Sequence, residues 1–169
     1  MFSIKILQTP GNIERLRERG PQLIDSLTSK MNLLMLKLQS KIVGETIPAF
    51  FPSGAPNIAS TVRAIPVELE GTVIHGEVQA GGPRTTKVTL HSGAEVDYAA
   101  VQEFGIYHSF TIVPFNKKML SFILDGKRIF AKMVTHPGLK QRPFMRYGLQ
   151  EMEAEIYEGL SEELTALFE

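Results

Sequence analysis

Cysteine and tryptophan are both missing from this sequence of 169 residues, and neither sign of charge is in excess, with 18 Lys and Arg against 18 Asp and Glu. A chain without cysteine can form no disulfide, no thiolate metal site and no cysteine nucleophile. Balanced charge argues against a polybasic protein that coats nucleic acid. The absence of cysteine therefore excludes a disulfide scaffold, and the charge balance argues against a histone-like protein.

Long apolar runs are also missing. No window approaches the ~20 apolar residues that a membrane-spanning helix needs, and Leu33–Leu36 is only a short run. The first residues, from Met1 to Leu7, lack the basic start and apolar core of a signal peptide. We therefore expect a protein that is made in the cytoplasm and does not enter a membrane.

Hydrophobic residues nevertheless make up 43% of the chain. A chain of this length can bury a sizeable core without a metal or a disulfide, and the length suits one domain. We therefore assign residues 1–169 to a single domain.

The N-terminal part predicts a helical region over 12–43, with Asn12 as its N-cap. Gly20-Pro21 is expected to end or kink a first short helix, because proline removes a hydrogen-bond donor, and Gly44 is expected to be the final stop. Between them, apolar residues recur at spacings of three and four. These residues are Leu23, Ile24, Leu27, Met31, Leu34, Met35, Leu38 and Ile42.

Residues 45–60 are rich in proline and glycine and predict a loop. Phe50 and Phe51 are unusual there, because adjacent phenylalanines are costly to leave in water. They either fold back on the core or face a partner chain.

Residues 61–135 predict a β-sheet with inserted loops. Alternating apolar residues favour strands at 67–70, 73–80 and 85–90. A hairpin is expected at 120–134, because Asp125-Gly126 stands between two apolar runs. A final helix is predicted over 143–168, entered through Pro143. The two long helices and the antiparallel sheet together predict an α+β fold.

Charge is sorted along the second half of the chain. The segment from Lys117 to Arg146 has eight bases and one acid, Asp125, and the segment from Tyr147 to Glu169 has seven acids and no base. The bases are Lys117, Lys118, Lys127, Arg128, Lys132, Lys140, Arg142 and Arg146, and the acids are Glu151, Glu153, Glu155, Glu158, Glu162, Glu163 and Glu169.

Three interpretations of this sorting remain open. The acids complement the dipole of the last helix, or the basic hairpin pairs with the acidic helix of a neighbouring subunit, or the acids form a wall that repels passing DNA. Under the second interpretation, Lys127, Arg128, Glu151 and Glu155 are candidate interface residues. Phe50 and Phe51 are further candidates if they face a partner chain.

No pattern in the sequence points to catalysis, a metal or a cofactor. The four histidines fit no metal-binding spacing. Glu95 and Asp97 would share a face of an extended strand, as a metal or acid–base pair needs, but two carboxylates near a turn are more often solvated. The basic stretch 117–146 with Phe122 and Phe130 superficially suits a nucleic-acid platform, although we expect both phenylalanines in the core of the sheet. We therefore predict that the protein is not an enzyme.

Three motifs carry more information, and their residue types indicate structural roles. Tyr98-Ala99 leads to Glu103-Phe104-Gly105, where Phe104 is expected to anchor in the core and Gly105 to allow a sharp exit. The second motif begins at Pro114. The third runs from His136-Pro137-Gly138 to Arg142-Pro143-Phe144-Met145-Arg146, in which Pro143-Phe144 starts the last helix. Arg142 and Arg146 are either solvated or form forks for acidic groups of a neighbouring subunit.

In order and spacing these motifs resemble the phage tail-completion and head–tail joining proteins over residues 90–169. That resemblance implies a structural virion protein at the neck or the head-proximal tail of a long-tailed double-stranded DNA phage or prophage. It also implies a homo-oligomeric ring, a hexamer or else a dodecamer, that contacts a portal-type connector and the tail tube or terminator protein. DNA would pass through the lumen without specific binding. A nucleic-acid-binding module that uses residues 117–146 is the alternative.

Overall fold

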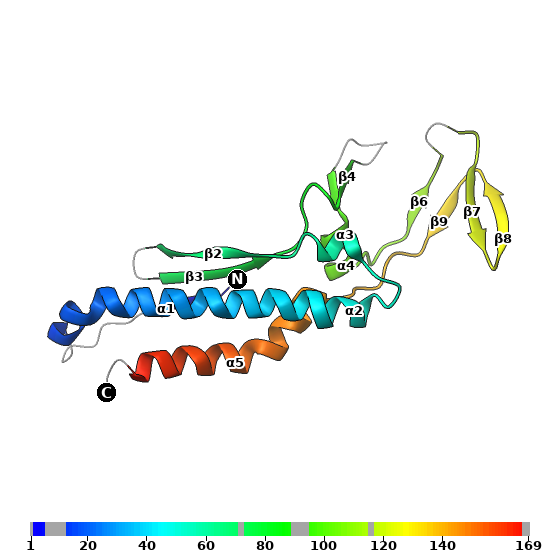
Figure 1. Cartoon of the computed structure of the whole chain (residues 1–169). Helices are drawn as coiled ribbons and strands as arrows, with labels where there is room; N and C mark the ends of the chain where they lie inside the picture. The colour runs from blue at the N-terminus through cyan, green and yellow to red at the C-terminus, as the bar shows by residue number, and fades with distance from the viewer. Residues whose placement is uncertain (1, 6–12, 71–72, 89–94, 115–116, 167–169) are drawn as a thin grey trace.

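The computed structural model describes residues 2–5, 13–70, 73–88, 95–114 and 117–166. The molecule is elongated: two long helices and a small sheet form a body, and two short pairs of strands project from one end of it (Figure 1). We call the part between Phe110 and His136 the arm. The chain has the α+β fold that the sequence predicts, with a long N-terminal helix, a C-terminal helix and small antiparallel sheets.

The N-terminal helix is longer than predicted. Helix α1 spans Ile13–Lys41 with Pro21 inside it, and it continues through a π-helical turn, η1 (Ile42–Thr46), into α2 (Ile47–Phe50). The helix therefore does not end at Gly20-Pro21, where an end or a kink is predicted, and the predicted stop at Gly44 is wrong. Gly44 does not adopt the positive φ that ends a helix, and burial of Ile42 and Ile47 holds the helical path together beyond it.

The predicted loop 45–60 is also helical in large part. It holds the end of η1, all of α2, and the short helix α3 (Pro56–Ala59). Proline occupies the first or second position of α2 and α3, where its missing N–H costs nothing because the first amides of a helix have no partner within it.

The sheet of the body has three antiparallel strands in the order β1 (Phe2–Lys5), β3 (Val73–Gln79), β2 (Arg63–Glu70). Strand β2 is an edge strand that contains Pro66 and a register shift between Ile65 and Glu68. Helix α1 covers amides of this strand: Ala64 N–H donates to Gln39 Oε1 at 2.9 Å, and Val67 N–H to Asn32 Oδ1 at 3.0 Å. These contacts protect the edge of β2 from pairing with another strand.

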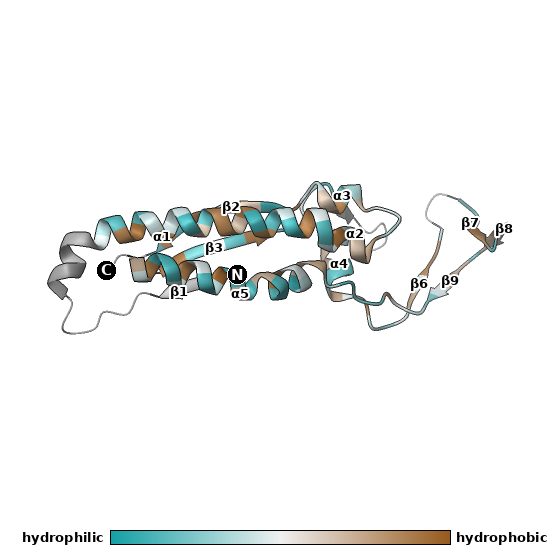
Figure 2. Ribbon diagram, turned by 60° about the horizontal axis from the view of Figure 1, so that its bottom comes forward, coloured by the Kyte–Doolittle hydropathy of each residue, from teal (hydrophilic) through white to brown (hydrophobic). Residues whose placement is uncertain are grey.

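The core lies between the sheet and the two long helices. The C-terminal helix α5 (Phe144–Ala166), predicted as 143–168, runs antiparallel along α1 (Figures 1 and 2). Two glycines allow β3 to pack closely on α1 and α5 to pack closely on η1. A Cβ at Gly76 on β3 would lie 2.9 Å from Met31 Cγ, and a Cβ at Gly148 on α5 would lie 2.6 Å from Ile42 Cγ1. Apolar residues of both helices and of β3 close this core, among them Leu27, Met31, Leu34, Met35, Ile42, Ile74, Phe144, Met152 and Ile156.

The strands between 61 and 135 do not join into one sheet, in contrast to the prediction. Strand β4 (Thr86–Val88) pairs with β5 (Glu95–Asp97), which leads into helix α4 (Tyr98–Phe104). In the arm, β6 (Phe110–Ile112) pairs with β9 (Val134–His136), and β7 (Leu120–Leu124) pairs with β8 (Lys127–Ala131). Among the described strands, those of the three-stranded sheet lie along α1, and the other pairs lie apart from it (Figure 1).

The predicted hairpin is confirmed. Asp125 and Gly126 have φ values of 49° and 74°, the two positive angles that a tight two-residue turn between antiparallel strands requires. The second strand is shorter than expected, because β8 ends at Ala131 and the chain resumes as β9 at Val134 to pair with β6.

Candidate functional site

The first and third motifs of the sequence lie against each other at the base of the arm, where the chain leaves the body after α4 and returns to it before α5. The backbones of Ile106 and Leu139 exchange two hydrogen bonds, of 2.8 and 2.9 Å, and Arg142 N–H donates to the Gln102 carbonyl at 2.6 Å. Segments more than thirty residues apart in the sequence therefore form one joint, which we call the arm base (residues 102–106 and 138–146).

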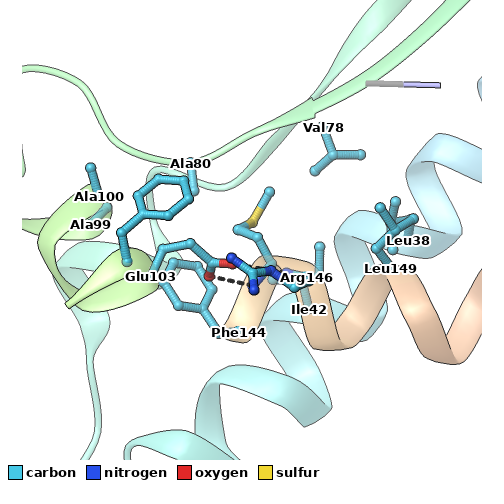
Figure 3. A pocket seen from close by; sticks show the side chains of 12 residues that line it. Leu38, Ile42, Val78, Ala80, Ala99, Ala100, Glu103, Phe144, Arg146 and Leu149 are labelled. Carbon is cyan, nitrogen blue, oxygen red and sulfur yellow. Dashed lines mark hydrogen bonds between the residues drawn. The ribbon is translucent and has the colours of Figure 1, made fainter. Parts of the chain in front are cut away.

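Glu103 is a buried acidic residue in the arm base. Its carboxylate accepts hydrogen bonds from Met145 N–H at 2.9 Å and from Arg146 N–H at 3.1 Å, and the residue is only 7% exposed. The first amides of a helix have no partner within the helix, and the N-terminal end of the helix dipole favours a negative charge. Glu103 thus caps α5 from a different helix, α4 (Figure 3).

Two glycines let the outgoing and returning chains come into backbone contact. Gly105 has φ +75°, and a Cβ there would lie 2.8 Å from the Leu139 carbonyl oxygen; Gly138 has φ +107°, and its Cβ would lie 2.2 Å from the Ile106 carbonyl oxygen. A residue with a side chain would be both strained and in collision at either position. The expectation that Gly105 permits a sharp exit agrees with this geometry.

Phe104 does not anchor in the core, and that prediction is wrong. Its side chain is 61% exposed, whereas the neighbouring Glu103 is buried. In the seven-residue helix α4, burial of the capping carboxylate turns Phe104 outward, so that Phe104 lines an open cleft of about 400 Å³. Val78, Ala100, Met145 and Leu149 are among the other lining residues.

Phe50 and Phe51, for which the sequence left two alternatives, fold back on their own chain. Phe51 is 6% exposed and meets the fully buried Phe144 edge to face, with ring centroids 6.0 Å apart. Phe50 packs in the same manner on Tyr147, at 5.7 Å. The Arg142 guanidinium lies over the Phe51 ring at 5.0 Å, a cation–π contact.

Asp97 has a structural role that the sequence analysis missed. Its Oδ1 accepts the Ala99 N–H at 2.9 Å as the N-cap of α4, and its Oδ2 accepts the Gly82 N–H at 3.0 Å. Burial alone would raise the pKa of the Asp97 carboxyl, but hydrogen bonds from Thr85, Gly82, Ala99 and Ala100 outweigh it and lower the pKa. An aspartate directly before Tyr98-Ala99 is the pattern of a helix N-cap, and this signal could have identified it.

The side chain of Glu95, the other carboxylate considered in the sequence, lies outside the described residues. Tyr98, next to the cap, is 46% exposed, and its N–H donates to the Thr85 carbonyl at 2.9 Å.

The arm carries exposed apolar residues that the sequence assigned to a core. Phe130 is 60% exposed and only Phe122 is partly covered, so the expectation that both lie in a sheet core is wrong for Phe130. The cause is the topology: β7 and β8 form a two-stranded sheet of their own, which lies apart from the helices of the body (Figure 1). Ile123 and Met133 are 69% and 60% exposed.

The other arm residues that the sequence singled out lie either at the hairpin turn or near the arm base. Lys127 and Arg128 are exposed beside the Asp125-Gly126 turn. Pro114 is half-buried. His136 stacks on Phe110, with ring centroids 5.0 Å apart, and its Nδ1 accepts the Gly138 N–H at 3.2 Å. Pro137 is exposed in the turn that follows.

Glu151 and Glu155 face α1 of their own chain. Lys41 Nζ lies 3.3 Å from Glu151 Oε2, and Lys37 Nζ lies 2.8 Å from Glu155 Oε1. Hydrogen bonds to Glu45 and Glu151 raise the pKa of Lys41. Because these pairs are accessible to water, each contributes little to stability.

The described part of the chain contains no group of three or more His, Asp or Glu side chains that could hold a metal ion. In the same residues, no helix is long and apolar enough to cross a membrane. Comparison with protein-family models, with curated proteins and with solved structures finds no match to this chain. The site is therefore an arm with exposed apolar side chains, joined to the body through the buried arm base.

Proposed function

We propose that this protein is a ring-forming subunit at the neck of a tailed phage or prophage, where it joins tail to head and lets DNA pass. Such a subunit acts through shape and binding energy. The observation that carries the proposal is the arm, which projects from a closed body and presents apolar side chains to water (Figure 1). The resemblance of the three motifs to tail-completion proteins supplies the biological setting.

An arm of this kind is expected to be covered in the working assembly. The apolar core of the body contains no residue of the arm, so the arm does not contribute to the stability of the body. A two-stranded hairpin alone is at best marginally stable in water, and exposed apolar patches on a protein mark its contact sites. Cover from another subunit would satisfy both conditions.

The asymmetry of the molecule supports a ring. The arm lies at one end of the molecule and the long helices at the other (Figure 1), so a contact between them is head-to-tail, and head-to-tail contacts close into rings when the rotation between copies permits. Sixfold symmetry is the expectation from the resemblance, with twelvefold as the alternative at a portal-type connector. An acidic helix surface near the lumen would repel passing DNA.

Truncation of the arm tests the proposal. Ile112 and Val134 are paired across β6 and β9, so residues 113–133 can be replaced by Asn-Gly, which closes a hairpin between paired residues. The truncated chain is expected to keep the helix content and urea midpoint of the full chain, because no core residue is lost. In light scattering and negative-stain micrographs, the full chain should form rings and the truncated chain should not.

The test in the virus is deletion of the coding sequence. Tails without joined heads are expected, and restoration should require the full chain, not the truncated one. Complete and infectious virions in the absence of the protein would overturn the proposal.

One observation favours a second function, nucleic-acid binding by the arm. Phe130 is exposed in the same hairpin as Lys127 and Arg128, and bases stack on aromatic side chains beside positive charge. Fluorescence anisotropy with labelled duplex and single-stranded DNA separates the two. Tight binding that weakens steeply with salt and disappears on truncation would support this alternative, whereas a subunit that only surrounds DNA should bind almost none.

A further inference from the structure

The hairpin at the end of the arm has two different faces. In the register of β7 and β8, Ile123 lies opposite Arg128 and Ser121 lies opposite Phe130. Paired residues share a face of a sheet, so Ile123, Phe130 and Arg128 lie on one face, which we call the contact face. Leu120, Phe122, Leu124, Ile129 and Lys127 lie on the other face, where Leu124 is 54% exposed. The contact face thus combines two strongly exposed apolar side chains, 69% and 60% exposed, with one exposed base.

The helical layer of the body has a matching surface. Leu33 and Leu36 of α1 are 52% and 56% exposed although they belong to a helix whose other apolar face forms the core. They stand beside Lys37, which bridges to Glu155 on α5. Glu158 and Glu162 continue the Glu155 side of α5 at helical spacing and are exposed. We call Leu33, Leu36, Glu158 and Glu162 the receiving face.

Of the acids on this side of α5, Glu158 and Glu162 are the ones available to a partner. Glu151 and Glu155 lie within 3.3 and 2.8 Å of Lys41 and Lys37 of the same chain. Within the described residues no ion pair involves Glu158 or Glu162, and α5 itself contains no base after Arg146.

We propose that the contact face of one copy binds the receiving face of the next copy. Ile123 and Phe130 would cover Leu33 and Leu36, and Arg128 would lie against Glu158 and Glu162. This inference rests on the proposed function, because it names the contact that closes the ring. The partner is a second copy, since the arm extends away from the helices of its own chain in both views (Figures 1 and 2) and both sides carry apolar residues with complementary charge.

The apolar and the charged interactions of this contact contribute differently to binding. The apolar pairs supply most of the binding energy, because desolvated apolar and aromatic anchors dominate interfaces. The single base between two acids sets the orientation and the rate of association more than the affinity. Salt is therefore expected to weaken the ring moderately, without dissolving it.

Cross-linking tests the contact directly, because the native chain has no cysteine. The variants Ile123→Cys and Leu36→Cys are prepared separately, mixed, allowed to assemble, and treated with a short bis-maleimide. A covalent dimer is expected in the mixture and not in either variant alone. A chain that carries both substitutions should give a ladder that ends at the number of subunits in the ring. The matched control, Ile123→Cys mixed with Glu68→Cys on the exposed part of β2, should give no dimer.

Charge reversal tests the orientation. Arg128→Glu is expected to raise the dissociation constant roughly ten-fold, equal to about 1.4 kcal/mol, and Glu158→Arg in the same chain should restore most of it. Lys127→Glu changes the charge of the arm equally but on the opposite hairpin face, so a markedly smaller effect is expected.

The outcomes separate this inference from the function it rests on. Rings in micrographs without the Ile123–Leu36 cross-link would overturn the contact and leave the ring function standing. An equal effect of Arg128→Glu and Lys127→Glu would also overturn it, because general attraction would then account for the charge dependence. Virions that are complete without the protein would overturn the function, and a protein that is monomeric at every concentration would overturn the contact.

Discussion

Replacing Glu103 should lower the stability of this fold more than replacing Phe104, although the sequence predicts Phe104 as the residue that anchors in the core. Glu103→Ala removes the carboxylate that accepts the Met145 and Arg146 amides at 2.9 and 3.1 Å. Loss of an exposed N-cap costs about 1 kcal/mol, because water takes its place. Glu103 is 7% exposed, so replacement by water is restricted, and each lost bond to a charged acceptor then costs about 1.5–3 kcal/mol.

We therefore expect the free energy of unfolding to fall by at least about 3 kcal/mol for Glu103→Ala, the lower end of the sum for the two bonds. For a domain of this size that loss lowers Tm by about 6–12 °C. Glu103→Gln keeps the shape and one acceptor oxygen and should lose about half as much. Phe104→Ala is the matched control: the side chain is 61% exposed, so its loss should change the free energy of unfolding by less than about 1 kcal/mol.

The assay is urea unfolding followed by circular dichroism, at a protein concentration where the chain is monomeric, because assembly would stabilise the fold. Amide hydrogen exchange at Met145 and Arg146 adds a local measurement. Protection of these two amides should drop in Glu103→Ala and persist in Phe104→Ala. The reasoning is refuted if Phe104→Ala costs more than Glu103→Ala, or if the two amides remain protected without the carboxylate.

Three further outcomes are expected in the same unfolding assay. Gly138→Ala should cost at least about 2 kcal/mol, because φ is +107° and its Cβ would lie 2.2 Å from the Ile106 carbonyl oxygen. Gly148→Ala, which forces α5 off η1, should cost about 1–3 kcal/mol, whereas Gly44→Ala, with open space around it, should stabilise the helix at η1 by up to about 1 kcal/mol. The stability contributed by Asp97, whose pKa is lowered in the folded state, should be complete above the unfolded value of 3.8 and lost as the pH falls through the lower folded value; Asp97→Asn should flatten the acid limb of a pH series.

Local rules predicted the elements that depend on local chemistry. The turn at Asp125-Gly126 needs two positive φ angles, and the residue pair that supplies them is visible in the sequence. The last helix has a proline at its entrance and an apolar stripe, and it begins at Phe144 as the pattern indicates. Neither element needs information from elsewhere in the chain.

The same rules failed where a distant segment decides. Gly44 would be a good helix stop in isolation, but packing of η1 on α5 carries the helical path past it. Phe130 alternates with apolar neighbours as a core residue would, yet its sheet has only two strands, a fact of topology that no local window contains. In α4, the sequence predicts that Phe104 is buried, but the structure buries Glu103 instead. The reason is that the first amides of α5 donate to the Glu103 carboxylate, and the position of α5 cannot be read from the sequence of α4.

The arm base links the two proposed contact faces within one subunit. Glu103 ties α4, from which the arm departs, to the first turn of α5, and α5 then carries the acids of the receiving face. The direction of the arm relative to those acids is therefore set by two hydrogen bonds and by the backbone contacts at Gly105 and Gly138. A ring closes only if the rotation from each copy to the next is correct. An error of about 5° per contact becomes about 30° over six copies, and this accumulation favours an open spiral. A buried, interlocked joint suits that requirement better than a flexible linker would, because it fixes the angle before assembly begins.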